Sequence, residues 1–244
     1  KSGIYMMIRL FMDILQPIPL WWGVTILVIG IISSLLGVLY ALTEHDIKRL
    51  LAYHSIENIG IILLGLGSAL IFSSLSMPAL AFLSLVAALF HTLNHAIFKS
   101  LLFLGAGSVI NQMHTRNMEE YGGLIKYMPQ TAFFFLIGSM AISALPPFNG
   151  FFSEWLTFQS LFQGIAILDS SMRWLFILAV GALAFTGGLA LACFVKAFGS
   201  IFLARPRSTE VTHAKESPRS MLIGMGALAM LSFLFGIFSS QTVS

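Results

Sequence analysis

The chain has 244 residues, of which 57% are hydrophobic and only 9% are charged. Soluble domains carry about 25% charged residues, so this composition excludes an ordinary soluble protein. The net charge of +3 is too small to indicate nucleic-acid binding, and the single cysteine, Cys193, excludes an internal disulfide, a cysteine-based zinc site and a thiolate-held iron–sulfur cluster.

Several apolar runs of about 18 residues or more predict an all-α protein, a polytopic bundle of membrane helices. A β-barrel would instead have short segments of alternating polarity. We expect one transmembrane domain over residues 1–244. Because Lys1 leads directly into apolar sequence, with no initiator Met and no signal peptide, we expect a fragment of a longer protein. The expected spans cover about residues 1–15, 20–42, 47–75, 78–110, 128–168, 172–203 and 220–238.

The expected span at 128–168 is too long for one uninterrupted crossing, and Pro146 and Pro147 interrupt it. It could be a loop between two short helices, or one discontinuous helix that is broken near 146–150. We favour the broken helix. Irregular backbone at membrane depth is tolerated where it lines a cavity enclosed by protein, and it often marks a transport site.

The loop charges support this count of crossings. If the broken helix crosses once, most loop cations lie on one side of the membrane, which is the cytoplasmic side by the positive-inside rule. The loops at 44–55, 111–127 and 204–219 are then cytoplasmic. The cations of that side are Lys48, Arg49, Arg116, Lys126, Arg205, Arg207, Lys215 and Arg219.

The most informative side chains are His91, His95 and Lys99, inside the apolar run at 78–110. On a helix they occupy positions i, i+4 and i+8, so they share one face. Ionisable groups are costly in a membrane helix and by default indicate an ion path or a proton relay. A neutral imidazole can accept a proton on one nitrogen and release it from the other. The alternative is a structural set that is bonded to Thr92, Asn94 and the backbone.

Other ionisable groups lie in or near apolar runs, and each has a structural alternative. Glu154 directly follows the break, where the start of the second half-helix favours an anion. We include Lys1 in the proton path with His91, His95, Lys99 and Glu154, although its long side chain could instead reach the interface. Lys196 is a possible path residue with the same structural alternative. Glu57 is another possible path residue that could act only on the helix dipole, and His54 is a weaker candidate.

Four stretches together resemble the family of antiporter-like membrane subunits shared by respiratory complex I, Mrp-type sodium/proton antiporters and membrane-bound hydrogenases. They are Lys1–Tyr5, Asp46–Tyr53, His91–Ser108 and Ala144–Glu154. Two further stretches are most similar to the hydrogenase-4 and formate hydrogenlyase members of this family, namely Tyr53–Gly60 and Phe194–Gly199.

The resemblance implies the C-terminal half of a fourteen-helix antiporter-like fold that conducts protons. It places Lys1 on the family's connecting lysine and Lys99 on its central lysine. His91 and His95 take the place of its bridging histidines, and Glu154 that of the terminal residue on the broken helix. The first half of the family's fold is absent, so this fragment should not pump alone.

From this resemblance we expect a non-catalytic, proton-translocating membrane subunit of a hydrogenase-type oxidoreductase complex, without redox chemistry or cofactors in this chain. The expected location is the inner membrane of a bacterium or archaeon. The expected partners are the lipid bilayer, other membrane subunits and, through them, a soluble hydrogenase with an iron–sulfur arm.

Three other functions are weighed against this one. The chain could belong to complex I or to an Mrp-type sodium/proton antiporter, or it could be a non-conducting assembly or anchoring subunit. A haem carrier is disfavoured, because His91 and His95 lie one turn apart and cannot bind opposite faces of one haem. We expect no metal site, because no cluster has metal-ligand spacing.

Overall fold

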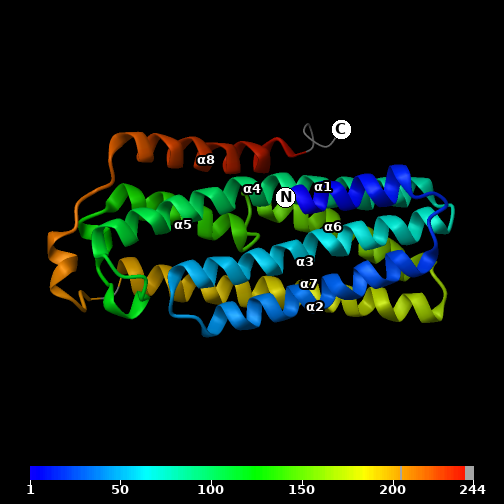
Figure 1. Cartoon of the computed structure of the whole chain (residues 1–244), viewed down its shortest axis with the longest axis horizontal. Coiled ribbons are helices and arrows are strands. Elements are labelled where there is room, and N and C mark those ends of the chain that lie inside the picture. Colours follow the sequence, from blue (N-terminus) through cyan, green and yellow to red (C-terminus); the bar gives the residue numbers. More distant parts are fainter. Residues whose placement is uncertain (204, 240–244) are drawn as a thin grey trace.

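The computed structural model describes residues 1–203 and 205–239, and within these ranges the fold is helical and contains no strand. The helices run roughly parallel along the long axis of the molecule (Figure 1). The predicted all-α bundle is therefore confirmed. The main helices are α1 (Ser2–Ile8), α2 (Leu20–Thr43), α3 (Ile47–Ser74), α4 (Pro78–Met113), α5 (Pro129–Ile142), α6 (Asn149–Ile167), α7 (Ser170–Phe198) and α8 (Arg219–Ile237).

Helix length and composition fit a lipid environment. A π-helical turn, η1 (Arg9–Ile14), extends α1, and a second one, η4 (Gly199–Leu203), extends α7. Large apolar side chains, such as those of Trp174 and Ile223, are exposed on the outside of the bundle, as expected where lipid is the solvent. The chain is a multi-pass membrane protein. In the described part of the chain, five helical segments are long and apolar enough to cross a membrane, namely α2, α3, α4, α7 with η4, and α8.

The predicted broken helix is present as α5 and α6, which follow one another along the bundle (Figure 1). The non-helical stretch covers residues 143–148, slightly earlier than the expected 146–150, because Asn149 and Gly150 already belong to the first turn of α6. Pro146 and Pro147 lack the backbone N–H that would continue the helical ladder. Together the two half-helices cover the length that an unbroken helix would cover.

α3 forms the centre of the bundle, and every residue from Gly60 to Phe72 is buried. Glycines allow α2 to approach α3 closely. A Cβ atom on Gly67 would lie 2.6 Å from the backbone nitrogen of Leu27. Small residues at such contacts let membrane helices gain van der Waals contact between their backbones. The close fit keeps α3, with its polar side chains, away from lipid.

The connections α2–α3, α4–α5 and α7–α8 gather at one end of the bundle, which we call the loop end (left in Figure 1). The backbone nitrogen of Arg207 donates to the carbonyl of Tyr121 over 3.2 Å, which joins two of these connections. Burial raises the pKa of the Tyr121 hydroxyl, so it stays protonated and donates to the carbonyl of Thr115 over 2.7 Å. The connections at the loop end are therefore held to one another by hydrogen bonds.

Carboxylates cap two helices at the loop end. Asp46 is the N-cap of α3 and accepts from the backbone nitrogens of Lys48 and Arg49 at 2.8 and 3.1 Å. Glu216 accepts from the backbone nitrogen of Gln130 at 2.8 Å, near the start of α5. Such contacts satisfy N–H groups that have no partner inside the helix.

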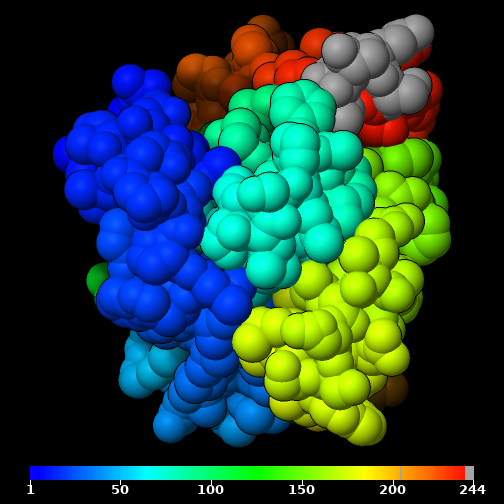
Figure 2. Space-filling view, turned by 90° about the vertical axis from the view of Figure 1, so that its right-hand side faces the viewer, coloured from blue at the N-terminus to red at the C-terminus, as the bar shows by residue number. Residues whose placement is uncertain are grey.

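Figure 2 views the opposite end, where the chain before α2 (blue), the turn between α3 and α4 (cyan) and the turn between α6 and α7 (yellow) lie side by side. At this end, Arg9 and Asp13, four residues apart, form an exposed ion pair of 2.5 Å. Exposed pairs contribute little to stability.

We predict that Gly67→Ala lowers the thermal stability of the intact protein in mild detergent, by about 1–3 kcal/mol of unfolding free energy, because the added methyl group forces α2 away from α3. Gly181→Ala on α7 is the matched control, since no heavy atom lies within 4 Å of the added Cβ there. Equal melting temperatures for the two variants would contradict close packing of α2 on α3.

Candidate functional site

The face of α4 that carries His91, His95 and Lys99 points into the bundle. The three side chains are 0%, 3% and 7% exposed, so none of them reaches the surface. Their neighbours come from α1, α3 and α6. The predicted ladder is thus assembled within the protein and away from lipid.

His91 contacts two other helices at once. Its Nε2 lies 3.2 Å from Oδ1 of Asn58 on α3, and its Nδ1 lies 3.0 Å from Oγ of Ser153 on α6. The amide of Asn58 donates to the carbonyl of His54, which orients its oxygen toward the ring. Nε2 therefore donates to Asn58, and Nδ1 of the neutral ring is the free acceptor.

Ser153 has more acceptors in reach than its one hydroxyl hydrogen can serve. Besides Nδ1 of His91, the carbonyl oxygens of Gly150 and Asn149 lie 3.0 and 3.2 Å from its Oγ. The hydroxyl can therefore donate to the ring when Nδ1 is unprotonated. When Nδ1 carries a proton, the hydroxyl can turn to a carbonyl and accept from the ring.

Lys1 and Lys99 meet His95 around one cavity. Nζ of Lys1 is hydrogen-bonded to Nδ1 of His95, whose ring lies nearly parallel to that of His91 at a centroid distance of 6.5 Å. A cavity of about 410 Å³ is lined by Lys1, His95, Lys99 and the two serines Ser55 and Ser100. Nε2 of His95 and Nζ of Lys99 have no hydrogen-bond partner among the described residues. Buried polar atoms of this kind normally bind ordered water, so this cavity can hold a water chain.

Glu57 on α3 is buried beside His54. It is 1% exposed and forms a buried pair with His54, whose ring packs on Phe194 of α7 at a centroid distance of 4.6 Å. The ring of His54 thus lies between the acid of α3 and an aromatic side chain of α7.

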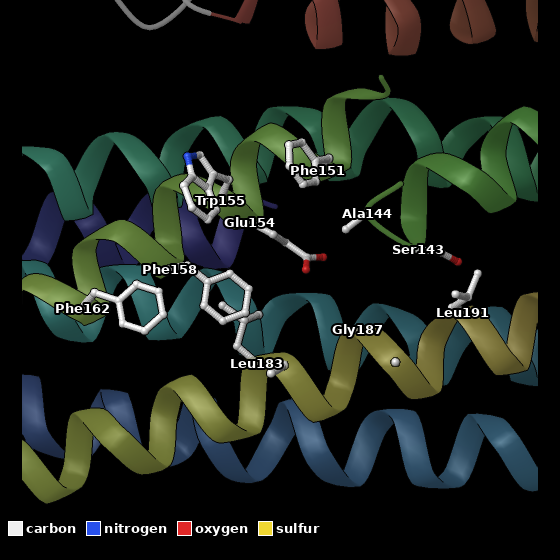
Figure 3. Close-up of a pocket in the computed structure, with 12 residues that line it drawn as sticks. Ser143, Ala144, Phe151, Glu154, Trp155, Phe158, Phe162, Leu183, Gly187 and Leu191 are labelled. Carbon is white, nitrogen blue, oxygen red and sulfur yellow. The ribbon is translucent and has the colours of Figure 1, made fainter. Parts of the chain in front are cut away.

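Glu154 occupies a second pocket. It lies in the second turn of α6, is 7% exposed, and points into a space of about 510 Å³ between α6 and α7 (Figure 3). Within residues 1–203 and 205–239, its carboxylate has no hydrogen bond and no ion pair. It follows Ser153 directly, so the acid is adjacent in the chain to the residue that contacts His91.

An asparagine pair fixes the start of α6 against α4. The amide of Asn94 donates to the carbonyl of Asn149 over 3.0 Å, and the amide of Asn149 donates to Oδ1 of Asn94 over 3.1 Å. Both residues are fully buried. These bonds hold the broken helix in register with the histidines of α4.

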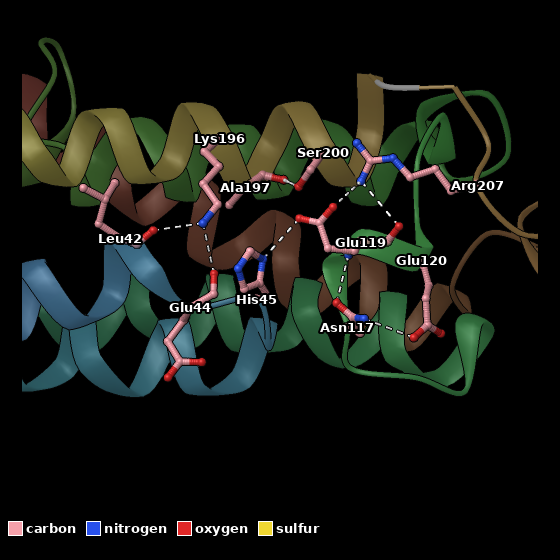
Figure 4. A network of polar contacts seen from close by, with 10 residues as sticks. All are labelled: Leu42, Glu44, His45, Asn117, Glu119, Glu120, Lys196, Ala197, Ser200 and Arg207. Atoms are coloured by element: carbon pink, nitrogen blue, oxygen red, sulfur yellow. Dashed lines mark hydrogen bonds and ion pairs between the residues drawn. The ribbon is translucent and has the colours of Figure 1, made fainter.

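Lys196 lies apart from these groups. Its Nζ donates to the carbonyls of Leu42 and Glu44 at 2.9 and 3.1 Å, at the C-terminal end of α2 (Figure 4). A cation there satisfies carbonyls that have no partner in the helix. In the same region, Glu119 pairs with His45 and Arg207 at 3.2 and 3.3 Å. Lys196 thus joins α7 to the C-terminal end of α2 by hydrogen bonds.

Sequence reasoning missed the neutral partners Asn58, Ser153 and Asn149, and it gave little weight to His54. One signal was available, because Asn58 lies four residues after His54 and hence on the same face of α3. The contacts of Ser153 and Asn149 join residues more than 50 positions apart, which no local pattern reveals.

Residues 1–186 match the family described as "NADH:quinone oxidoreductase/Mrp antiporter, TM". The chain belongs to this family. The resemblance inferred from the motifs is therefore confirmed.

Two similar relatives come from Escherichia coli strain K12. Hydrogenase-4 component B is 50% identical over 242 residues, and formate hydrogenlyase subunit 3 is 48% identical over 224 residues. These alignments cover 98% and 90% of this chain but only 36% of each relative, so the chain spans about a third of their length.

A similar solved structure is that of the membrane-bound sulfane sulfur reductase, an archaeal respiratory membrane complex. One of its chains superposes with a TM-score of 0.79 at 26% identity, covering 97% of this chain and 37% of that one. The antiporter-like fold predicted from the motifs is thus present in this chain.

We predict that Asn94→Leu lowers the melting temperature of the intact protein, because it leaves the amide of Asn149 without its buried acceptor. Interhelical hydrogen bonds in membrane proteins contribute about 0.6–2 kcal/mol each. The matched control is Thr92→Val on the same helix, whose hydroxyl bonds only to its own helix at Ala88. A melting temperature for Asn94→Leu equal to that of the control would contradict a role for the asparagine pair.

Proposed function

We propose that this chain is a proton-conducting part of a membrane subunit of a hydrogenase-type oxidoreductase complex, of the formate hydrogenlyase or hydrogenase-4 kind. The observation that carries the proposal is a line of buried polar side chains. Lys1 is hydrogen-bonded to His95 and His91 to Ser153, next to Glu154, and the rings of His95 and His91 lie 6.5 Å apart between centroids. The identity of 50% and 48% to the two Escherichia coli subunits supports the choice of complex.

In the proposed proton transfer, His95 uses both ring nitrogens, whereas His91 takes up and releases a proton at Nδ1 alone. His95 exchanges a proton with Lys1 at Nδ1 and with the water of the adjoining cavity at Nε2. A proton released by His95 is then taken up by His91 at Nδ1, while Nε2 of His91 stays bonded to Asn58. The hydroxyl of Ser153 then turns from the ring to the carbonyl of Gly150, 3.0 Å away, and accepts from the charged ring.

Charge on neighbouring groups directs the transfer. Lys1 and Lys99 line the same cavity as His95, so positive charge on either lysine disfavours a proton on the ring. Such charge–charge interactions are strong in a low-dielectric interior. A change of charge at either end of the line therefore moves protons along it, with Glu154 as the acid at the end on α6.

The whole subunit acts within a larger assembly. Within the described residues no group of three or more His, Cys, Asp or Glu side chains is placed to hold a metal ion. We infer that other membrane subunits flank this one and connect it to a soluble hydrogenase with an iron–sulfur arm. The family's occurrence in respiratory membrane complexes supports this inference.

We further propose that residues 1–244 form one transmembrane domain that crosses the membrane seven times, with α5 and α6 as one crossing. The gathering of the loops at 44–55, 111–127 and 204–219 at the loop end supports this topology. Because these loops carry most of the basic residues, we place the loop end in the cytoplasm of a bacterium or archaeon.

We predict that Lys99→Ala, introduced into the intact complex, abolishes proton translocation while the complex still assembles, because the cavity loses its buried cation. The measurement is acidification of proteoliposomes per hydrogen molecule turned over. Thr92→Val on the same helix, whose hydroxyl bonds only to Ala88, is the control and should translocate normally. Unchanged translocation in Lys99→Ala would remove this lysine from the path, and translocation that required sodium would favour the antiporter alternative.

A further inference from the structure

The pocket that holds Glu154 has a chemistry distinct from that of the cavity beside Lys99. Its walls are aromatic and aliphatic, and Glu154 is the one ionisable side chain among the residues that line it. Figure 3 shows the carboxylate pointing into this space, with the rings of Phe158 and Phe162 further along the same wall. The pocket thus combines one anion with a long apolar wall.

The pocket is not filled by side chains of α7, and it is open to the outside of the bundle. Gly187 and Gly188 of α7 form part of its lining, so the surface of that helix is bare opposite the acid. A Cβ on Gly188 would have no heavy atom within 4 Å. Trp155 and Phe162 are 47% and 49% exposed, so the pocket opens on the outer surface of the bundle between α6 and α7.

Glu154 as a residue is 7% exposed, and its carboxylate is unpaired within the described residues, so a cation that entered the pocket would meet an uncompensated acceptor. Charge-assisted hydrogen bonds are the strong ones, and an ammonium group gains further attraction from aromatic faces. The volume of about 510 Å³ falls in the range of small-molecule sites, which bury an apolar body against a few placed polar groups.

We propose that this pocket binds a lipophilic amine, whose ammonium group donates to Glu154 and whose alkyl chain packs along Trp155, Phe158 and Phe162. The amine enters from the lipid side of α6 and α7. This step rests on the proposed function. The bound ammonium pairs with Glu154, the acid at the end of the proton line, and thereby stops proton translocation. The site is therefore a point where amphiphilic cations inhibit the complex.

The test measures binding of dodecylamine to the intact complex in nanodiscs, by the shift in melting temperature as the amine is titrated. Dodecanol, which has the same chain and no charge, should cause a much smaller shift. Glu154→Gln removes the anion, and we expect it to weaken amine binding by about tenfold or more, as for the loss of a charged hydrogen bond. An equal response to the amine and the alcohol would overturn the proposal.

A second pair of variants tests the pocket without changing the acid. Gly188→Leu fills the pocket with a side chain and should raise the half-saturating amine concentration by about tenfold or more, since it displaces several buried methylene groups of the ligand. Gly181→Leu lies two turns earlier on the same exposed face of α7, outside the pocket, and should bind as the wild type does. Equal binding by these two variants would place the amine elsewhere.

Proton translocation without amine separates this proposal from the function on which it rests. Normal translocation by Glu154→Gln, combined with lost amine binding, would refute the role of Glu154 in the proton line and leave the binding site in place. Loss of translocation with undiminished amine binding would refute the site alone. Liposomes without protein correct for proton leakage caused by the amine itself.

Discussion

His91 is bonded to helices on both sides of α4, and the rest of the site depends on this contact. One ring nitrogen lies against Asn58 on α3 and the other against Ser153 on α6. Buried polar groups are costly unless they are paired, so each bond fixes the rotation of the helix that supplies it. Together with the asparagine pair, this contact fixes the start of the broken helix, from which Glu154 projects, against α4.

The helices around the site are held together by close packing and by polar contacts. Glycines bring α2 so close to α3 that α3 becomes the buried centre of the bundle, and the asparagine pair ties α4 to the start of α6. Lys196 closes α7 onto the end of α2. The ionisable residues sit inside this frame, where low polarity strengthens every charge–charge interaction. In such an arrangement, a change of charge on one ionisable side chain alters the protonation energy of its ionisable neighbours.

Much of this arrangement could be predicted from the sequence, because it follows from local periodicity. The spacing of His91, His95 and Lys99 predicts one shared face, and the two prolines predict the break before α6. What could not be predicted is the set of contacts between helices. Glu57 could be a helix-dipole partner or a path residue, and only the structure shows that it is buried and paired with His54. Lys196 had two equally plausible environments, and the carbonyls that it contacts belong to a helix about 150 residues earlier in the chain.

The most direct test of the account is the number of protons moved per hydrogen turned over in a His91→Gln variant of the intact complex. Glutamine can keep a hydrogen bond to Asn58 or Ser153 but cannot take up a proton, so it separates the structural role of His91 from its role as a carrier. We predict a folded, assembled complex that turns over hydrogen and moves few or no protons through this subunit. An unchanged proton yield in the assembled variant would contradict the central claim.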